Sequence, residues 1–190
     1  MTRKIIGGVF LSLDGVMQAP GGPDEDPTGG FPFGGWLPPV ADDDLGAEID
    51  RLFDGPFDLL LGRRTYDIFA AHWPFMPQDH PIAASFAKAR KYVLTTADHE
   101  WTWEGSQRVP DIAALTALKA ENGPNLVIQG SSTLYPQLLE HGLLDRITLM
   151  VAPVILGQGK RLFGDGTPPR RMQLIEHRLS RGGIAMATFE

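Results

Sequence analysis

The stretch from residue 59 to residue 66 reads Leu59-Leu60-Leu61-Gly62-Arg63-Arg64-Thr65-Tyr66. Three consecutive leucines predict a strand that is buried on both faces, and Gly62 marks a turn into a helix over about 64–71. A buried strand that passes through glycine directly into a helix is the unit from which parallel sheets with helical crossovers are built. We therefore expect an α/β fold.

The same alternation of short apolar runs and helical patterns continues on both sides of this stretch. Further strands are expected over 4–11, 92–94, 126–128 and 147–151, and further helices over 42–54, 111–121 and 132–141. Segments 171–179 and 184–189 flank Arg181-Gly182-Gly183 and predict a hairpin of antiparallel strands. No internal repeat or second composition zone divides the chain, so 1–190 is expected to be one domain with helices on both faces of a mostly parallel sheet.

Composition excludes several classes of protein. The 190 residues carry 17 Lys+Arg against 23 Asp+Glu, a formal net charge of −6, which is the wrong sign for a general nucleic-acid binder. No window reaches the roughly 18 apolar residues of a membrane span. The chain has no cysteine, and its five histidines show no paired ligand spacing, so no metal is expected. We predict a cytoplasmic protein that binds neither nucleic acid nor membrane.

The turn after Leu61 has the properties of an anion site. The first amides of a helix lack partners within the helix, and the helix dipole attracts negative charge there. Thr65 offers a hydroxyl, and Arg63 and Arg64 offer guanidinium groups that suit a phosphate. The alternative is a plain glycine turn in which Thr65 caps the helix and both arginines are solvated.

A second turn, Gln129-Gly130-Ser131-Ser132-Thr133-Leu134, repeats this design with small residues after a buried strand. Gly130 allows close approach of the backbone, and the amides of Ser131 and Ser132 would face a ligand. Leu94-Thr95-Thr96 ends a third strand. Several such turns favour a nucleotide with more than one phosphate, although neither a Gly-x-Gly-x-x-Gly fingerprint nor a P-loop is present.

Two other segments have alternative interpretations. The long Gly- and Pro-rich connection from Gln18 to Pro39 is interpreted as a lid over the site, the alternative being a floppy insertion. The run Asp42-Asp43-Asp44 is expected to cap the helix that follows; the alternative is that one carboxylate points into the site, as a folate reductase requires.

Taken together, the motifs resemble the dihydrofolate-reductase-like superfamily, and specifically the family of the reductase domain of the bifunctional riboflavin-biosynthesis deaminase-reductase. They run in family order over nearly the whole chain. The motifs are Ser12-Leu13-Asp14-Gly15, residues 61–66, Tyr92-Val93-Leu94-Thr95-Thr96, residues 130–134, Gly142-Leu143-Leu144-Asp145 and residues 153–163.

The resemblance implies a homodimer that binds NADPH across the carboxyl edge of the sheet. It implies that Arg63 contacts the adenosine 2′-phosphate, that Thr65 contacts the diphosphate, and that Gly62 and Arg64 belong to the same cofactor turn. The remaining cofactor residues by resemblance are Thr95, Thr96, Gly130, Ser131, Ser132 and Leu134. Many relatives carry a Gly-Gly pair where this chain has Gly130-Ser131, and serine tolerates a positive φ less readily.

On the substrate side, the resemblance places Asp14 near the nicotinamide and makes it the candidate catalytic residue. Asp-Gly is also an ordinary turn dipeptide, so a purely structural role stays open. Met17, Gln18 and Trp36 are the candidate substrate-binding residues.

The expected activity is NADPH-dependent hydride transfer to a C=N or C=O carbon of a small heterocyclic or ribosyl-pyrimidine substrate. The resemblance is to 5-amino-6-(5-phosphoribosylamino)uracil reductase. Two alternatives remain: a nucleotide-binding or regulatory module on the same scaffold without catalysis, and, less favoured, a dihydrofolate reductase.

Overall fold

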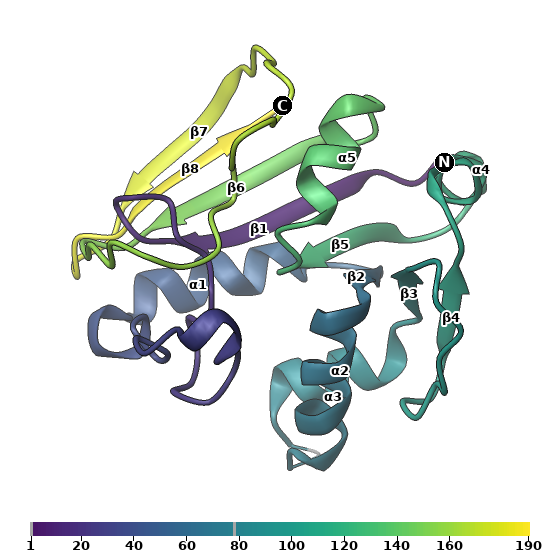
Figure 1. The fold of residues 1–190 in the computed structure, drawn as a ribbon, viewed down its shortest axis with the longest axis horizontal. Coiled ribbons are helices and arrows are strands. Elements are labelled where there is room, and N and C mark those ends of the chain that lie inside the picture. The colour runs from purple at the N-terminus through teal and green to yellow at the C-terminus, as the bar shows by residue number, and fades with distance from the viewer. Residues whose placement is uncertain (1, 78) are drawn as a thin grey trace.

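A computed structural model describes residues 2–77 and 79–190 and shows one continuous eight-stranded sheet with helices on both faces (Figure 1). The strands are β1 (Ile5–Leu11), β2 (Phe57–Gly62), β3 (Lys91–Leu94), β4 (Ser106–Val109), β5 (Asn125–Gln129), β6 (Arg146–Val151), β7 (Leu174–Leu179) and β8 (Ala185–Phe189). The helices are α1 (Asp43–Leu52), α2 (Arg63–His72), α3 (Pro81–Lys88), α4 (Ile112–Ala120) and α5 (Leu134–Glu140).

The strand order is β4-β3-β2-β5-β1-β6-β8-β7. The first six strands in this order are parallel to one another, and β8 and β7 are antiparallel additions. The expected mostly parallel sheet with a C-terminal antiparallel hairpin is therefore confirmed. Because β2, β5 and β1 are neighbours, the loops that leave their carboxyl ends emerge side by side.

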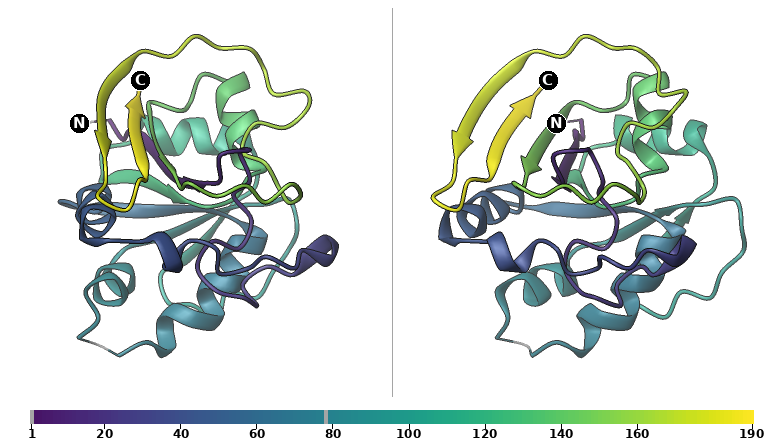
Figure 2. Two further views of the ribbon diagram at one scale, coloured as in Figure 1. Left: turned by 90° about the vertical axis from the view of Figure 1, so that its left-hand side faces the viewer. Right: turned by 60° about the vertical axis from the view of Figure 1, so that its left-hand side comes forward.

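The helices form two layers, with α4 and α5 on one face of the sheet and α1, α2 and α3 on the other (Figure 2). Alternation along each strand divides the core accordingly. Leu60 packs in the cluster on the α4 and α5 side, whereas Leu59 and Leu61 pack with residues of α2 and α3. The three leucines are each fully buried, as a strand covered on both faces requires.

The central strand β1 carries two adjacent glycines, Gly7 and Gly8, that let helices approach the sheet from both faces. A Cβ at Gly7 would lie 2.7 Å from the hydroxyl of Tyr135 on α5, and a Cβ at Gly8 would lie 2.3 Å from Leu52 on α1. These distances are shorter than van der Waals contact, so both layers pack directly on the β1 backbone.

Sequence periodicity located the other elements to within a few residues but missed two. Helix α3 and strand β4 had no predicted counterpart. Phe86 of α3 is nearly fully buried among the rings of Trp73 and Trp103, so α3 is held by tertiary contacts. Strand β4 is short and polar, and pairing with β3 defines it.

In the described ranges, no helix is long and apolar enough to cross a bilayer.

Candidate functional site

The two turns predicted to bind an anion lie against each other, because β2 and β5 are neighbouring parallel strands. The hydroxyl of Ser131, which follows β5, accepts a hydrogen bond from the Gly62 backbone N–H (2.8 Å) and donates one to the Thr65 hydroxyl (2.6 Å). A side chain at Gly62 would collide with Ser131, at 2.8 Å from its hydroxyl oxygen. The sequence thus brings two loops, 69 residues apart, into one polar surface.

Backbone conformation at the second turn is unusual. Gly130 and Ser131 both have positive φ, +84° and +75° respectively. Ser131 is one of only two non-glycine residues with positive φ among those described, the other being Ala19. Such a conformation is disfavoured for a residue with a Cβ, and here the two hydrogen bonds of the Ser131 hydroxyl offset it.

Helix α2 begins at this surface without a side-chain cap. Gly62 is its N-cap residue and makes no capping hydrogen bond, so the sequence-based alternative in which Thr65 caps the helix is wrong. The guanidinium of Arg63 forms an ion pair with Asp67 one turn along the helix (2.7 Å), and Arg64 donates to the hydroxyl of Thr28 (3.0 Å). Arg63, Arg64 and Thr65 of this first turn all line the same space.

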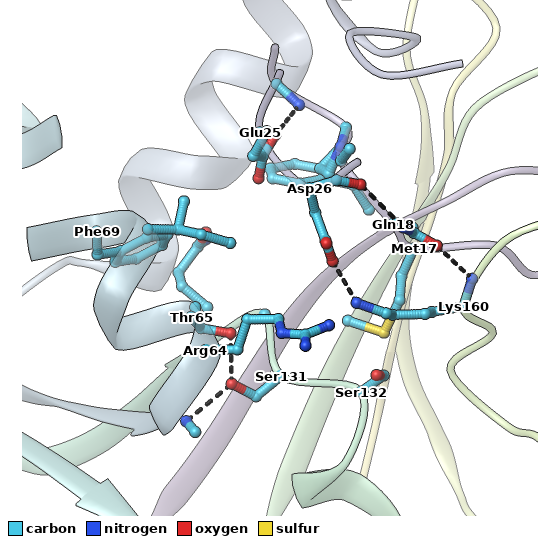
Figure 3. A pocket seen from close by; sticks show the side chains of 18 of the residues that line it. Met17, Gln18, Glu25, Asp26, Arg64, Thr65, Phe69, Ser131, Ser132 and Lys160 are labelled. Atoms are coloured by element: carbon cyan, nitrogen blue, oxygen red, sulfur yellow. Dashed lines mark hydrogen bonds and ion pairs between the residues drawn. The ribbon is translucent and has the colours of Figure 1, made fainter. Parts of the chain in front are cut away.

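That space is a cavity of about 510 Å³ at the carboxyl edge of the sheet. One wall consists of the two turns, and the other comes from the loop after β1 (Figure 3). Predicted site residues on its lining are Met17, Gln18, Gly62, Arg63, Arg64, Thr65, Gly130, Ser131 and Ser132. The cavity also includes aromatic surface from Phe69 and Trp73.

The loop from Gln18 to Pro39 is held over this cavity by its own polar contacts. The side-chain NH₂ of Gln18 donates to the backbone carbonyls of Asp26 and Thr28, both at 2.9 Å. The side-chain oxygen of Gln18 accepts from the backbone N–H of Lys160 (3.0 Å). Trp36 donates its indole N–H to the Gln18 carbonyl (2.8 Å). The structure supports the lid interpretation over that of a floppy insertion.

An ion pair between Asp26 and Lys160 lies on the cavity wall opposite the two turns (Figure 3). Lys160 also donates to the hydroxyl of Thr28 (2.7 Å), the group that Arg64 contacts from α2. Burial alone would raise the pKa of Asp26, but hydrogen bonds from Lys160 and Thr28 outweigh it and lower that pKa. Sequence reasoning missed this pair because 134 residues separate its members, and nothing in the motif of residues 153–163, which contains Lys160, points to Asp26.

Asp14, the candidate catalytic residue, does not line the cavity. Its carboxylate accepts hydrogen bonds from the Ser12 hydroxyl (2.7 Å) and from the backbone N–H groups of Leu156 (3.1 Å) and Gly157 (2.9 Å). The Ser12 hydrogen bond is the main cause of a pKa lowered to about 2, and the backbone bonds add to it. In this structure, Asp14 is an acceptor that ties the β1 turn to the loop after β6.

Four other predicted site residues are also outside the cavity lining. Trp36 and Leu134 are buried in apolar clusters. Thr95 and Thr96 follow β3, where their carbonyls accept from Arg108 of β4 at 3.2 and 2.7 Å. The two threonines follow β3, which pairs with β2, so they flank the Arg63 end of the site.

The acidic run at the start of α1, Asp42 to Asp44, serves the helix, as expected. Asp42 is the N-cap residue and accepts from the Leu45 N–H (3.0 Å), and its second oxygen accepts from the Gly182 N–H in the β7–β8 turn. Asp44 binds Arg181 of the same turn. The run contributes nothing to the cavity lining, where the carboxylates are instead Glu25 and Asp26. Asp42, Asp43 and Asp44 thus do not supply the carboxylate that a folate reductase requires in its site.

Within the two described ranges, no cluster of three or more His, Asp or Glu side chains is arranged to hold a metal ion.

With this fold and site described, comparison with known proteins identifies the class. Residues 3–186 match the model of the RibD C-terminal domain family, and the chain belongs to that family.

Solved structures of related fold include a putative riboflavin biosynthesis protein from Shewanella sp. PV-4, with a TM-score of 0.67 and 22% identity over 100% of this chain and 98% of that one. A dihydrofolate reductase from Enterococcus faecalis, complexed with NADP(H), has a TM-score of 0.62 and 14% identity over 100% and 98% of the two chains.

The Thermotoga maritima diaminohydroxyphosphoribosylaminopyrimidine deaminase/5-amino-6-(5-phosphoribosylamino)uracil reductase has a TM-score of 0.63 and 12% identity. The match covers 99% of this chain and 56% of that protein. These likenesses show that the fold is dihydrofolate-reductase-like, as the sequence motifs predicted.

Proposed function

We propose that this protein is an NADPH-dependent reductase that transfers a hydride to a C=N or C=O carbon of a small heterocyclic or ribosyl-pyrimidine substrate. The observation that carries the proposal is the meeting of the α2 turn and the Gly130–Ser131 turn on one wall of a 510 Å³ cavity beneath an ordered lid. Membership of the RibD C-terminal domain family and the fold shared with an NADP(H)-binding reductase support it.

The residues of this wall fit a dinucleotide. The start of α2 has no side-chain cap, and Gly130 and Ser131, both with positive φ, line the cavity beside it. Gly62, Thr65, Ser131 and Ser132 would hold the diphosphate, and Arg63 at the outer end would hold the 2′-phosphate. A bound nicotinamide supplies the hydride; the protein supplies position and excludes water.

The opposite wall would receive the substrate. Met17 and Gln18 form part of it, and Lys160 presents an ammonium group that Asp26 and Thr28 hold in place. Such a fixed donor suits a carbonyl or ring nitrogen that gains electron density as the hydride arrives. Asp14 would act on this reaction through the loop that it braces.

We also propose a homodimer, which the family resemblance implies. The apolar run 150–156 that suggested an interface is in part committed to the core of the chain, since Met150 and Ala152 are fully buried. Ile155 is 74% exposed, and Leu179 on the edge strand β7 is 72% exposed. These side chains are better placed for contact between copies.

The test is a titration with NADPH and, separately, NADH, followed by tryptophan fluorescence, because Trp73 lies on the cavity wall. We expect NADPH to bind with a Kd in the micromolar range or below. Arg63→Ala should weaken NADPH more than NADH, and an unchanged ratio would refute the 2′-phosphate assignment. Failure of both dinucleotides to bind would overturn the reductase proposal itself.

The alternative of a binding module without catalysis is motivated by the altered diphosphate turn, in which Ser131 stands where many relatives carry glycine. Cofactor binding without any NADPH oxidation across pyrimidine, pterin and quinonoid substrates would support this alternative. Stoichiometric oxidation with any one of them would exclude it.

A further inference from the structure

The partner of Arg63 raises a question about cofactor choice. Its guanidinium is bound to Asp67, four residues along α2, at 2.7 Å. The second carboxylate oxygen of Asp67 lies 3.0 Å from Nε2 of His99, in the loop that follows β3. Asp67 therefore bridges the helix that carries the cofactor turn and the loop that carries Thr95 and Thr96.

This bridge is held in place by packing. The ring of His99 meets Tyr66 of α2 and Trp101 edge to face, with ring centroids 5.8 and 5.2 Å apart, and Tyr66 is nearly fully buried. The Asp67 side chain is 36% exposed, and that of Arg63 is 45% exposed, so both are accessible to a ligand. Asp67 is thus a fixed carboxylate beside the only arginine that the proposed function assigns to the 2′-phosphate.

A 2′-phosphate carries about −1.5 to −2 charges near pH 7, and it would compete with Asp67 for the same guanidinium. NADH has a hydroxyl at that position, so its binding does not require Arg63 to leave Asp67. In dinucleotide-binding proteins generally, a carboxylate near the ribose favours NAD and an arginine favours NADP. This chain places one of each in contact.

We propose that Asp67 is a specificity-determining residue, which competes with the 2′-phosphate for Arg63 and limits the preference for NADPH over NADH. The inference rests on the proposed function. His99 is the positioning residue: it keeps a contact with Asp67 when Arg63 turns to the phosphate, so the carboxylate stays beside the ligand.

The experiment measures Kd for NADPH and for NADH by tryptophan fluorescence in the wild type and in Asp67→Asn, which keeps the shape of the side chain. Asp54→Asn is the matched control: Asp54 is exposed and precedes β2, at the opposite edge of the sheet from the site. We expect Asp67→Asn to raise the ratio Kd(NADH)/Kd(NADPH) about fivefold, the size of one favourable exposed charge pair, and Asp54→Asn to leave it unchanged.

The rise in the ratio Kd(NADH)/Kd(NADPH) should come from a lower Kd for NADPH. An unchanged ratio, or a ratio that rises only because NADH binds more weakly, would overturn the inference. A second pair of variants, Arg63→Ala and Arg63→Ala/Asp67→Asn, isolates the competition, because without Arg63 the loss of Asp67 should change the ratio much less. An equal effect in both backgrounds would also overturn it. If neither dinucleotide bound the wild type, the proposed function itself would fail. That outcome differs from the case in which both bind and the ratio does not change in Asp67→Asn, which refutes only the role of Asp67.

Discussion

Replacing Asp14 by asparagine distinguishes a residue that braces the site from one that acts in the reaction. The Asp14 carboxylate accepts four hydrogen bonds: one from the Ser12 hydroxyl, two from backbone N–H groups of the loop after β6, and a longer one from the Arg161 guanidinium (3.4 Å). An asparagine side chain has one acceptor oxygen, and its NH₂ group would face an N–H donor. The variant therefore loses contacts that join β1 to that loop.

The magnitude follows from the pKa of Asp14. A fall from the ordinary 3.8 to about 2 corresponds to about 2.4 kcal/mol of the free energy of unfolding at neutral pH. The side chain is 20% exposed, so solvent screening reduces the expected cost of Asp14→Asn to about 1 kcal/mol. Because the folded-state pKa is lowered, this stability is present above about pH 4 and is lost as pH falls toward 2.

Urea unfolding at pH 7, 4 and 3, with Asp54→Asn as the control, measures the effect. We expect Asp14→Asn to be less stable than the wild type at pH 7, with a difference that shrinks on acidification, and to keep its affinity for NADPH. A variant as stable as the wild type at pH 7 would refute this reasoning. If it also lost turnover, Asp14 would be the catalytic residue that the motif suggested.

Four further outcomes are expected. Ser131→Ala and Ser131→Gly both lose the hydroxyl contacts, but alanine keeps the strain of positive φ, so it should be about 1 kcal/mol less stable in urea unfolding; equal stabilities would contradict this. Asp42→Ala should lower the free energy of unfolding by about 1 to 2 kcal/mol through loss of the helix cap, and Asp43→Ala, which removes no cap, should cost clearly less. Lys160→Met should speed proteolysis within residues 20–39, which its ammonium helps to hold; Lys88→Met, on the exposed end of α3, serves as control, and equal rates would refute the contact's role. Sedimentation equilibrium should give twice the 20.8 kDa chain mass, and a concentration-independent monomer would remove the homodimer.

The sequence was most informative where side-chain pattern and backbone hydrogen bonding agree. Leu59-Leu60-Leu61 predicted a strand covered on both faces, and Gly62 predicted the start of α2, because burial and turn chemistry are local properties. The two polar turns that follow β2 and β5 were predicted for the same reason. The meeting of these turns followed from one further rule, that parallel strands share a carboxyl edge.

The parts that were missed depend on contacts between distant residues. Nothing local marks Lys160 as the partner of Asp26, and nothing in the Leu-Asp-Gly motif shows that Asp14 turns toward the backbone of Gly157. Asp67 was overlooked because an i,i+4 pair with Arg63 is an ordinary helix feature. What distinguishes Asp67 from an ordinary helix residue is a second contact: the loop after β3 brings His99 to the carboxylate oxygen that does not bind Arg63.

The paired glycines of β1 have a consequence for how this chain can vary. Gly7 touches Tyr135 of α5, and α5 follows the turn that contains Ser131; Gly8 touches Leu52 and also lines the cavity. The absence of side chains at these two positions of β1 therefore sets how closely α5 and α1 approach the sheet. At Gly8 it also sets the depth of the cavity floor. In homologous chains we expect volume to be conserved across these contacts, so that a larger residue at the position of Gly7 is accompanied by a smaller one at that of Tyr135.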